Sequence, residues 1–253
     1  MTACAVLVER GDPDRFLATM AAPPALRDRL WPLYAYNLEI ARAPWASREP
    51  MIAEMRLQWW VEALEETAAG RPARAHEVAA PLAAVIREAG LDIAPLIAMA
   101  EARRWDIWTE PFPDAEALAA HLDATAGGLM WSAARALGAP ERAEPVVRDF
   151  AFGAGLAAWF LAVPELLSRG RQPLPPTDLA SLAAQGQARM AAARRHRALI
   201  PASAGAALRA GWRADAILRQ ARRSPDRIAA GLPVEPEILR RGRLLRLVLT
   251  GRW

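Results

Sequence analysis

Asp106, Glu110 and Asp114 follow one another at intervals of four residues. On one continuous helix this spacing would put three carboxylates on the same face. Carboxylate oxygens are the ligands that a hard divalent cation such as Mg²⁺ prefers. Pro111 and Pro113 interrupt the segment, however, and proline ends or kinks a helix. The three acids are therefore not expected to form a metal site.

The residues GAGLAA at 153–158 match the pattern G-x-G-x-x-A of dinucleotide-binding loops. That motif needs a strand before it and a ribose-binding acid about twenty residues later. Here the preceding residues have a helical pattern and the acid is missing. The small residues therefore predict close packing between helices and no nucleotide site.

The histidines and the cysteine give no metal-binding pattern either. His76, His121 and His196 lie far apart, with no carboxylate at ligand spacing, and are expected to be solvated or hydrogen-bonded. Cys4 is the single cysteine, which excludes an internal disulfide and a cysteine-based metal cluster. A chain of this kind fits a reducing compartment.

The composition favours a helical globular protein. Hydrophobic residues make up 53% of the 253 residues and charged residues 24%, values that argue against disorder and against an integral membrane protein. Alanine is abundant while valine and isoleucine are sparse, which favours helix over sheet. Lysine is absent, and a net charge of +4 with no aromatic-and-basic motif predicts no nucleic-acid partner.

Prolines and glycines divide the chain into helical segments, and no alternating strand pattern or long linker is present. The sequence therefore predicts one all-α domain over residues 1–253. The expected helices cover residues 25–43, 51–69, 78–89, 92–108, 115–137, 144–168, 179–198, 202–222 and 236–250.

Two of these helices carry specific expectations. Within residues 51–69, Ile52, Met55, Trp59 and Ala63 recur at helical spacing and are predicted to face the core. The uncharged run inside 144–168 is too short to span a bilayer and predicts a buried central helix.

The N-terminus lacks the pattern of a secretory signal or transit peptide, so a cytoplasmic location is expected.

Four stretches together resemble the squalene/phytoene synthase family, in that family's order and spacing. They are LYAYNLEIAR (33–42), RLQWWVEALE (56–65), EARRWDIWTEPFPDAEALAAHLDATAGGLMW (101–131) and GLAAWFLAVPELLSRGRQPLP (155–175). The resemblance implies the all-α isoprenoid synthase fold, with helices around a central cavity that holds prenyl chains. It also implies head-to-head joining of prenyl diphosphates, with Mg²⁺ held by two acidic motifs on facing helices.

This chain departs from the family at the metal positions. The first acidic pair aligns with Ala41 and Trp45, and the second with Ala162 and Leu166. Arg42 stands beside the first site, so the local charge is reversed as well. No metal site and no cofactor are therefore predicted, and Mg²⁺ is expected only if the chain is an active synthase.

The phrases YAYNLEIAR and RLQWW, with acids missing at the metal positions, resemble one branch of the family. This branch includes a mitochondrial respiratory complex I assembly factor and its bacterial relatives. The resemblance implies a binding scaffold that helps to assemble the NADH dehydrogenase complex and has no catalytic residue. The expected partners are respiratory-complex subunits and a prenyl or other lipid in the cavity.

The alternative is a divergent prenyltransferase that binds diphosphate through arginines, which hold phosphate groups without a metal. The candidate cavity or diphosphate-binding residues are Glu39, Arg42, Arg56, Arg103, Arg104, Asp106 and Arg171. Structural roles compete with this assignment. Arg56 and Asp106 could form an ion pair between helices, and Arg171 could cap the carbonyls at a helix end.

The C-terminal residues 237–253 interleave arginines with leucines. Such a basic amphipathic segment could lie on an anionic membrane surface, which would make the protein peripheral on the inner face of the membrane, or dock on a partner helix. The alternative is a last bundle helix with a solvated arginine face. The arginines concerned are Arg240, Arg241, Arg243 and Arg246.

Overall fold

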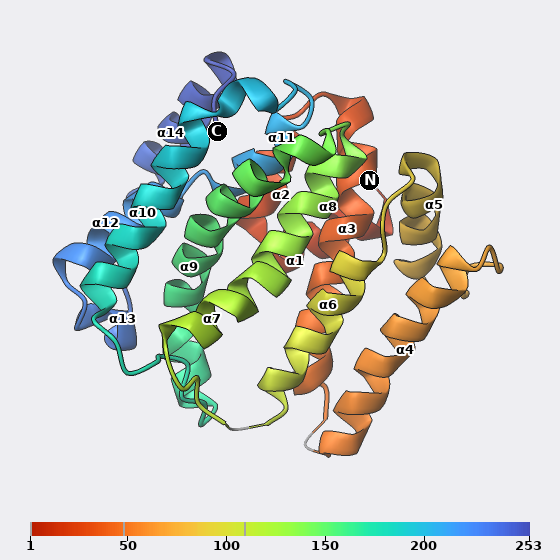
Figure 1. Ribbon diagram of the computed structural model, residues 1–253, viewed down its shortest axis with the longest axis horizontal. Helices are drawn as coiled ribbons and strands as arrows, with labels where there is room; N and C mark the ends of the chain where they lie inside the picture. The colour runs from red at the N-terminus through yellow and green to blue at the C-terminus, as the bar shows by residue number, and fades with distance from the viewer. Residues whose placement is uncertain (1, 48, 109) are drawn as a thin grey trace.

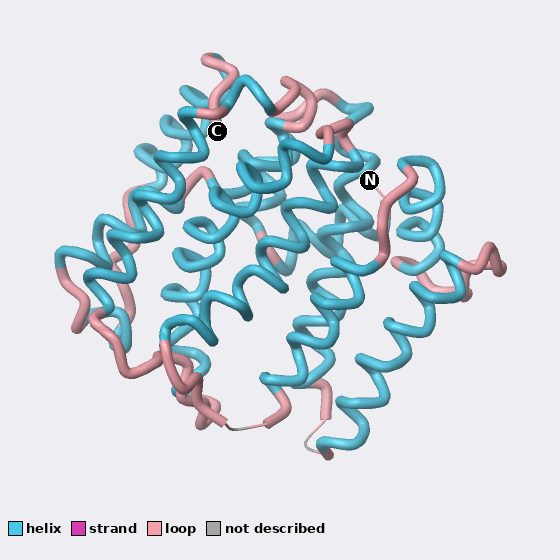
Figure 2. The backbone as a smooth tube through the Cα atoms, in the orientation of Figure 1, coloured by secondary structure: helices cyan, strands magenta, loops and turns pink. Residues whose placement is uncertain are grey.

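The computed structural model describes residues 2–47, 49–108 and 110–253, and within these ranges every regular element is a helix (Figures 1 and 2). The predicted all-α fold is confirmed. The α-helices are α1 (Ala3–Gly11), α2 (Pro13–Met20), α3 (Pro24–Arg42), α4 (Pro50–Ala68), α5 (Ala79–Ala89), α6 (Ala94–Ala102), α7 (Ala115–Leu122), α8 (Gly128–Ala136), α9 (Glu144–Ser168), α10 (Leu179–Arg195), α11 (Gly205–Leu208), α12 (Ala214–Arg223), α13 (Arg227–Ala230) and α14 (Glu237–Leu249).

Short helical turns join several of these helices. The 3₁₀ turns η1 (Ala43–Trp45) and η2 (Arg103–Asp106) extend α3 and α6, and the π-helical turn η3 (Asp123–Gly127) joins α7 to α8. The helix expected at 115–137 is therefore continuous from α7 to α8, with a π-helical turn between them. The helix expected at 202–222 is instead divided into α11, the 3₁₀ turn η6 (Arg209–Gly211) and α12.

Helices α1 and α2 are not among the helices predicted from the sequence. The side-chain oxygen of Thr2 accepts a hydrogen bond from the amide of Ala5, and Asp12 accepts one from the amide of Arg15 at 3.0 Å. Pro13 takes the first position of α2, where its missing N–H costs nothing. The pair Asp12-Pro13 is thus a signal in the sequence for the start of a helix.

Helix α9 lies at the centre of the bundle and packs against α8, α10 and α12 (Figure 1). With the turn before it, α9 is long and apolar enough to cross a membrane by length and composition, although the uncharged run between Asp149 and Glu165 is shorter than the helix. However, 61% of its most apolar window is buried inside the bundle. The expectation of a buried central helix is confirmed.

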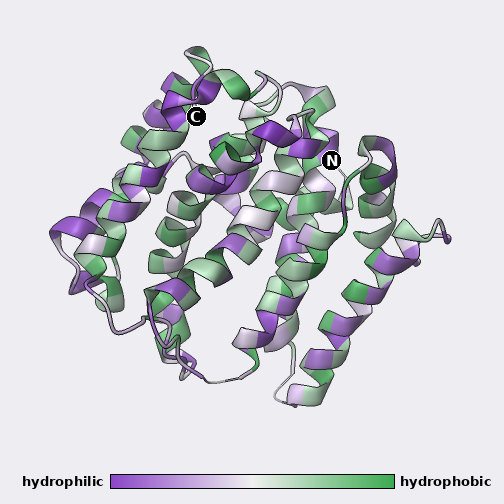
Figure 3. Ribbon diagram, viewed as in Figure 1, coloured by the Kyte–Doolittle hydropathy of each residue, from purple (hydrophilic) through white to green (hydrophobic). Residues whose placement is uncertain are grey.

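The core-facing stripe predicted for α4 is correct only in its second half, where Trp59 packs against the core and Ala63 is buried. Ile52 and Met55 are 43% and 66% exposed, whereas Leu57 and Trp60 are buried. Helix α4 has apolar residues on two sides, and Figure 3 shows hydrophobic and hydrophilic residues intermixed along it. Helical periodicity reports that a face is apolar but not which face meets the rest of the protein.

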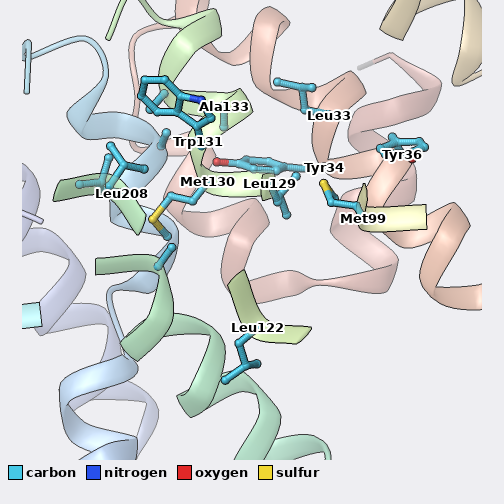
Figure 4. Close-up of a cluster of buried hydrophobic side chains, with 14 of the residues drawn as sticks. Leu33, Tyr34, Tyr36, Met99, Leu122, Leu129, Met130, Trp131, Ala133 and Leu208 are labelled. Atoms are coloured by element: carbon cyan, nitrogen blue, oxygen red, sulfur yellow. The ribbon is translucent and has the colours of Figure 1, made fainter. Parts of the chain in front are cut away.

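Tyr34 and Tyr36 anchor α3 in the core from two sides. Tyr36 donates a 2.7 Å hydrogen bond to the carbonyl of Leu96 at the interior of α6. Tyr34 lies beside Leu129 and Met130 of α8 (Figure 4). Because both rings are almost fully buried, they fix α3 against the α6–α8 layer.

The GAGLAA segment packs closely, as the sequence predicts. A Cβ added at Gly153 would lie 2.7 Å from the carbonyl oxygen of Gly186 on α10 and against the side chain of Met190. A Cβ added at Gly155 would lie 2.5 Å from the Cβ of Ala126. These glycines let neighbouring backbones approach α9 on both sides.

Gly153→Ala should lower the free energy of unfolding by about 1–3 kcal/mol, because the added methyl overpacks the α9–α10 contact. Gly242→Ala on α14, where an added Cβ meets nothing within 4 Å, is the matched control. It should raise stability by about 0.5–1 kcal/mol through helix propensity. Urea denaturation measures both, and equal effects of the two changes would contradict the packing assignment.

Candidate functional site

The two segments that align with the family's metal positions meet at Trp45. Ala41 and Trp45 lie at the end of α3 and in η1, while Ala162 and Leu166 lie near the end of α9. The guanidinium carbons of two arginines that follow α9, Arg169 and Arg171, lie 4.4 and 5.1 Å from the ring centroid of Trp45. Such cation–π contacts hold the two helix ends together.

Arg171 also joins these segments to η2. Its Nη2 donates to the backbone carbonyls of Asp106 at 2.7 Å and Ile107 at 3.4 Å. Arg171 therefore caps backbone carbonyls, as one alternative expected. These carbonyls belong to the end of η2 and not to the end of α9. Asp106 itself pairs with Arg103 at 3.5 Å, so the expected pairing with Arg56 was wrong.

The carboxyl of Asp106 is buried in this network. Burial raises its pKa above the usual range, while Arg103 and then Arg171 and Arg169 act in the opposite direction. A second acid, Glu165, is exposed and pairs with Arg169 at 2.7 Å. The site therefore contains three guanidinium groups and two carboxylates. The carboxylates of Asp106 and Glu165 already pair with arginines of the site.

This residue set does not fit Mg²⁺. Within residues 2–47, 49–108 and 110–253, no group of three or more His, Cys, Asp or Glu side chains could hold a metal ion. Where the family's acids would converge, this chain presents an indole and two arginines. Guanidinium groups repel a divalent cation at this range and supply no oxygen ligand.

The structure does not gather the seven candidate residues into one site. Arg103, Asp106 and Arg171 lie together next to Trp45. Arg104 lies on the outer surface, where it pairs with Glu54 of α4 and with Glu101, at 2.7 Å.

Glu39, Arg42 and Arg56 form a third group in a groove between α3 and α4, the α3–α4 groove, which has a volume of about 430 Å³. The exposed side chains of Ile52 and Met55 line the same groove. Its floor includes Trp59 and Trp60. The stretches YAYNLEIAR and RLQWW, which carry the branch resemblance, thus meet in this groove.

An aromatic cluster fills the interior next to the metal positions. Trp105 stacks on Phe112 with ring centroids 4.6 Å apart, and Trp159 lies edge-on to Trp105 at 5.4 Å. The indole of Trp159 donates to the carbonyl of Pro173 at 2.9 Å. His121 completes the cluster, with its ring centroid 5.1 Å from that of Trp159.

His121 is neither solvated nor hydrogen-bonded through Nε2, so the expectation for the histidines fails here. Burial, with a smaller effect of Arg103, lowers its pKa to about 3, and the ring is neutral at physiological pH. The other two behave as expected: His76 accepts a hydrogen bond from the amide of Val78 at 3.1 Å, and His196 is exposed. Sequence spacing could not reveal the cluster, because its members come from separate segments.

A pocket of about 220 Å³ remains between α3, α8, α9 and α12, and we refer to it as the α9 pocket. Its apolar wall includes Gly155, Ala158 and Leu161 of α9 together with Leu129 and Met130 of α8. Its polar end contains charged residues that pair with one another or with neighbours. These are Asp12, Asp14, Arg15 and Arg213.

The sequence profile of squalene/phytoene synthases matches residues 8–245. Among solved structures, a dehydrosqualene synthase in complex with ligand is similar with a TM-score of 0.79 and 15% identity, over 98% of this chain and 94% of that chain. Squalene synthase HpnC from Alicyclobacillus acidocaldarius is similar with a TM-score of 0.73 and 18% identity, over 87% and 92%. At these identities the similarity shows the fold.

One further relative is similar over a short region. A Drosophila melanogaster protein described as "NADH dehydrogenase (ubiquinone) complex I, assembly factor 6 homolog" is 36% identical over 64 residues. The match covers 25% of this chain and 19% of that protein.

Because His121 has a lower pKa folded than unfolded, the unfolded state takes up the proton first as the pH falls below about 6.5. This residue should therefore cost about 2 kcal/mol of stability between about pH 6.5 and pH 5. His121→Leu should lose less stability over this range than the native chain. Urea denaturation at a series of pH values measures the difference.

His196→Leu is the matched control, since His196 is exposed and lies outside the aromatic cluster. Parallel profiles for the native chain and His121→Leu would contradict a lower pKa of His121 in the folded state than in the unfolded state.

Proposed function

This chain belongs to the squalene/phytoene synthase family, and we propose that it is a non-catalytic member that acts as a binding scaffold in the assembly of the respiratory NADH dehydrogenase complex. Fold similarity alone does not carry this proposal, because folds are shared by proteins of different function.

The contact of Arg169 and Arg171 with Trp45 carries the non-catalytic part. Ionising an allylic diphosphate requires a cation that stabilises the departing group, and in this family Mg²⁺ held by carboxylates supplies it. The four aligned positions in this chain, Ala41, Trp45, Ala162 and Leu166, offer no oxygen ligand. The proposal therefore includes no reaction step.

Three of the five arginines that a metal-free prenyltransferase could use are engaged with the protein itself. Arg171 donates to two backbone carbonyls, and Arg103 pairs with buried Asp106. Arg104 pairs with acids on the outer surface. Diphosphate binding by these groups would break existing contacts, which favours the scaffold over the alternative enzyme.

The proposed role in assembly rests on the similarity to the Drosophila assembly-factor homolog and on the α3–α4 groove. Arg42 and Arg56 on this groove are exposed, and neither pairs with a carboxylate of the described residues. Exposed apolar side chains beside uncompensated cations are typical of protein-binding surfaces. We place the contact with respiratory-complex subunits there.

A lipid ligand is part of the same proposal. The α9 pocket has an apolar wall and a polar end, the arrangement that an apolar chain with a polar head requires. Because the aromatic cluster fills the neighbouring interior, we propose that this pocket holds one chain and not two.

The purified protein should give no product from farnesyl diphosphate or geranylgeranyl diphosphate with Mg²⁺, because no residue set holds the metal. Radiolabelled substrate and extraction of apolar products measure this. A squalene synthase assayed in parallel is the positive control, and native mass spectrometry of the same protein shows whether a lipid is bound. A Mg²⁺-dependent apolar product would refute the non-catalytic assignment.

Deletion of the gene in the source organism should reduce the assembled NADH dehydrogenase complex, measured by native gel electrophoresis and NADH oxidation in isolated membranes. The native chain should restore the complex. A chain with Arg42→Glu and Arg56→Glu should not, because the groove would repel its partner. A chain with Arg142→Glu and Arg223→Glu serves as the matched control, since both arginines are exposed and neither lines the groove.

Normal levels of the complex in the deletion strain would contradict the assembly role. Full rescue by the Arg42→Glu and Arg56→Glu chain would contradict the α3–α4 groove as the contact surface.

A further inference from the structure

Helix α14 has apolar residues on two opposite faces. On the inner face, Leu244 is buried with Ala18 of α2 and Trp212, and Leu247 and Val248 pack against the same cluster. This face explains why the helix lies on the bundle.

The outer face has no partner among the described residues. Ile238, Leu245 and Leu249 are 81%, 58% and 77% exposed. At 100° per residue these three positions fall on one line along the helix, and Gly242 falls on the same line. A side chain added at Gly242 would meet nothing within 4 Å. We call these four positions the α14 outer stripe.

Arginines flank this stripe on both edges. The same helical geometry puts Arg241 on one edge and Arg246 on the other, and no acid on the outer half of the helix. Arg241 pairs with Glu237, but both side chains are exposed, so the pair is weak. The alternative of a last bundle helix with exposed arginines is therefore correct in part, but the centre of the outer face is apolar.

Of the remaining arginines of α14, one fixes the helix to α2 and one fixes it to the loop that precedes it. Arg240 pairs with Asp14 of α2, and Arg243 pairs with Glu235 at 2.7 Å. Beyond the helix, the carbonyl of Trp253 accepts a 3.0 Å hydrogen bond from Arg194 of α10. Because these contacts hold both ends of the segment, the outer stripe cannot turn inward.

We propose that the α14 outer stripe docks on an anionic lipid bilayer, with its apolar side chains at the boundary between headgroups and acyl chains. A single helix on a convex surface, apolar along its centre and cationic on both edges, matches a flat anionic surface. The arginine stems lie alongside the apolar stripe while their charged ends reach the lipid phosphates. This inference is independent of the proposed scaffold function.

Sedimentation with vesicles tests the proposal on the full chain. The protein should bind phosphatidylcholine vesicles that contain about 30% phosphatidylglycerol, and binding should weaken as salt rises from about 0.1 to 0.5 M. It should bind pure phosphatidylcholine vesicles much less. Arg246→Gln should weaken binding to the anionic vesicles about fivefold.

Substitutions in the stripe give the sharper comparison. Ile238→Glu with Leu245→Glu should reduce binding about tenfold or more, because charges replace apolar groups at the lipid boundary. Ile52→Glu with Met55→Glu, which changes the exposed apolar residues of α4, should leave binding unchanged.

Gly242 provides a pair of variants that differ only in polarity. Gly242→Leu and Gly242→Glu both improve helix propensity, and neither side chain meets a neighbour, so both should fold. Gly242→Leu should strengthen vesicle binding severalfold, and Gly242→Glu should weaken it by a similar factor.

The proposal is overturned if the native chain fails to bind anionic vesicles, or if the two Gly242 variants bind them equally. It is also overturned if light scattering shows a dimer that Ile238→Glu with Leu245→Glu dissociates while vesicle binding persists. In that case the stripe would be an interface between copies of the chain.

Discussion

The contact of two guanidinium groups with the indole of Trp45 determines what the centre of this protein can do. It joins the end of α3 and η1 to the segment that follows α9, the place where the family's acidic helices would face each other. In a synthase, carboxylates at this place attract a divalent cation. Here the cations belong to the protein: backbone carbonyls of η2 hold Arg171, and Glu165 holds Arg169. One set of contacts thus joins the helix ends and puts guanidinium groups where the family has carboxylates.

Helix α9 shows how small side chains serve packing and binding together. Gly153 allows α10 to approach one side of α9, while Gly155, Ala158 and their neighbours leave space on the other. Large aromatic residues occupy the interior near the end of the same helix, where Trp159 packs on Trp105. The space left for a ligand is therefore limited by the protein's own side chains.

The α3–α4 groove and the α14 outer stripe both expose apolar side chains. Both lie on helices whose opposite face packs on the bundle, so each helix is apolar on two sides. The groove is concave and includes tryptophan and methionine side chains, as a protein partner requires. The stripe is convex and edged by arginine, as a lipid surface requires.

The sequence by itself determined the helical class, most helix positions and the loss of the four metal acids, because these follow from local composition, proline and glycine positions, and aligned residue types. It could not determine which apolar face of α4 or α14 packs inward, because helical periodicity is the same for either face. It also could not pair Arg171 with Trp45 and the carbonyls of η2, or place His121 among Trp105, Phe112 and Trp159. Those contacts join residues far apart in the chain, and only tertiary packing brings them within reach.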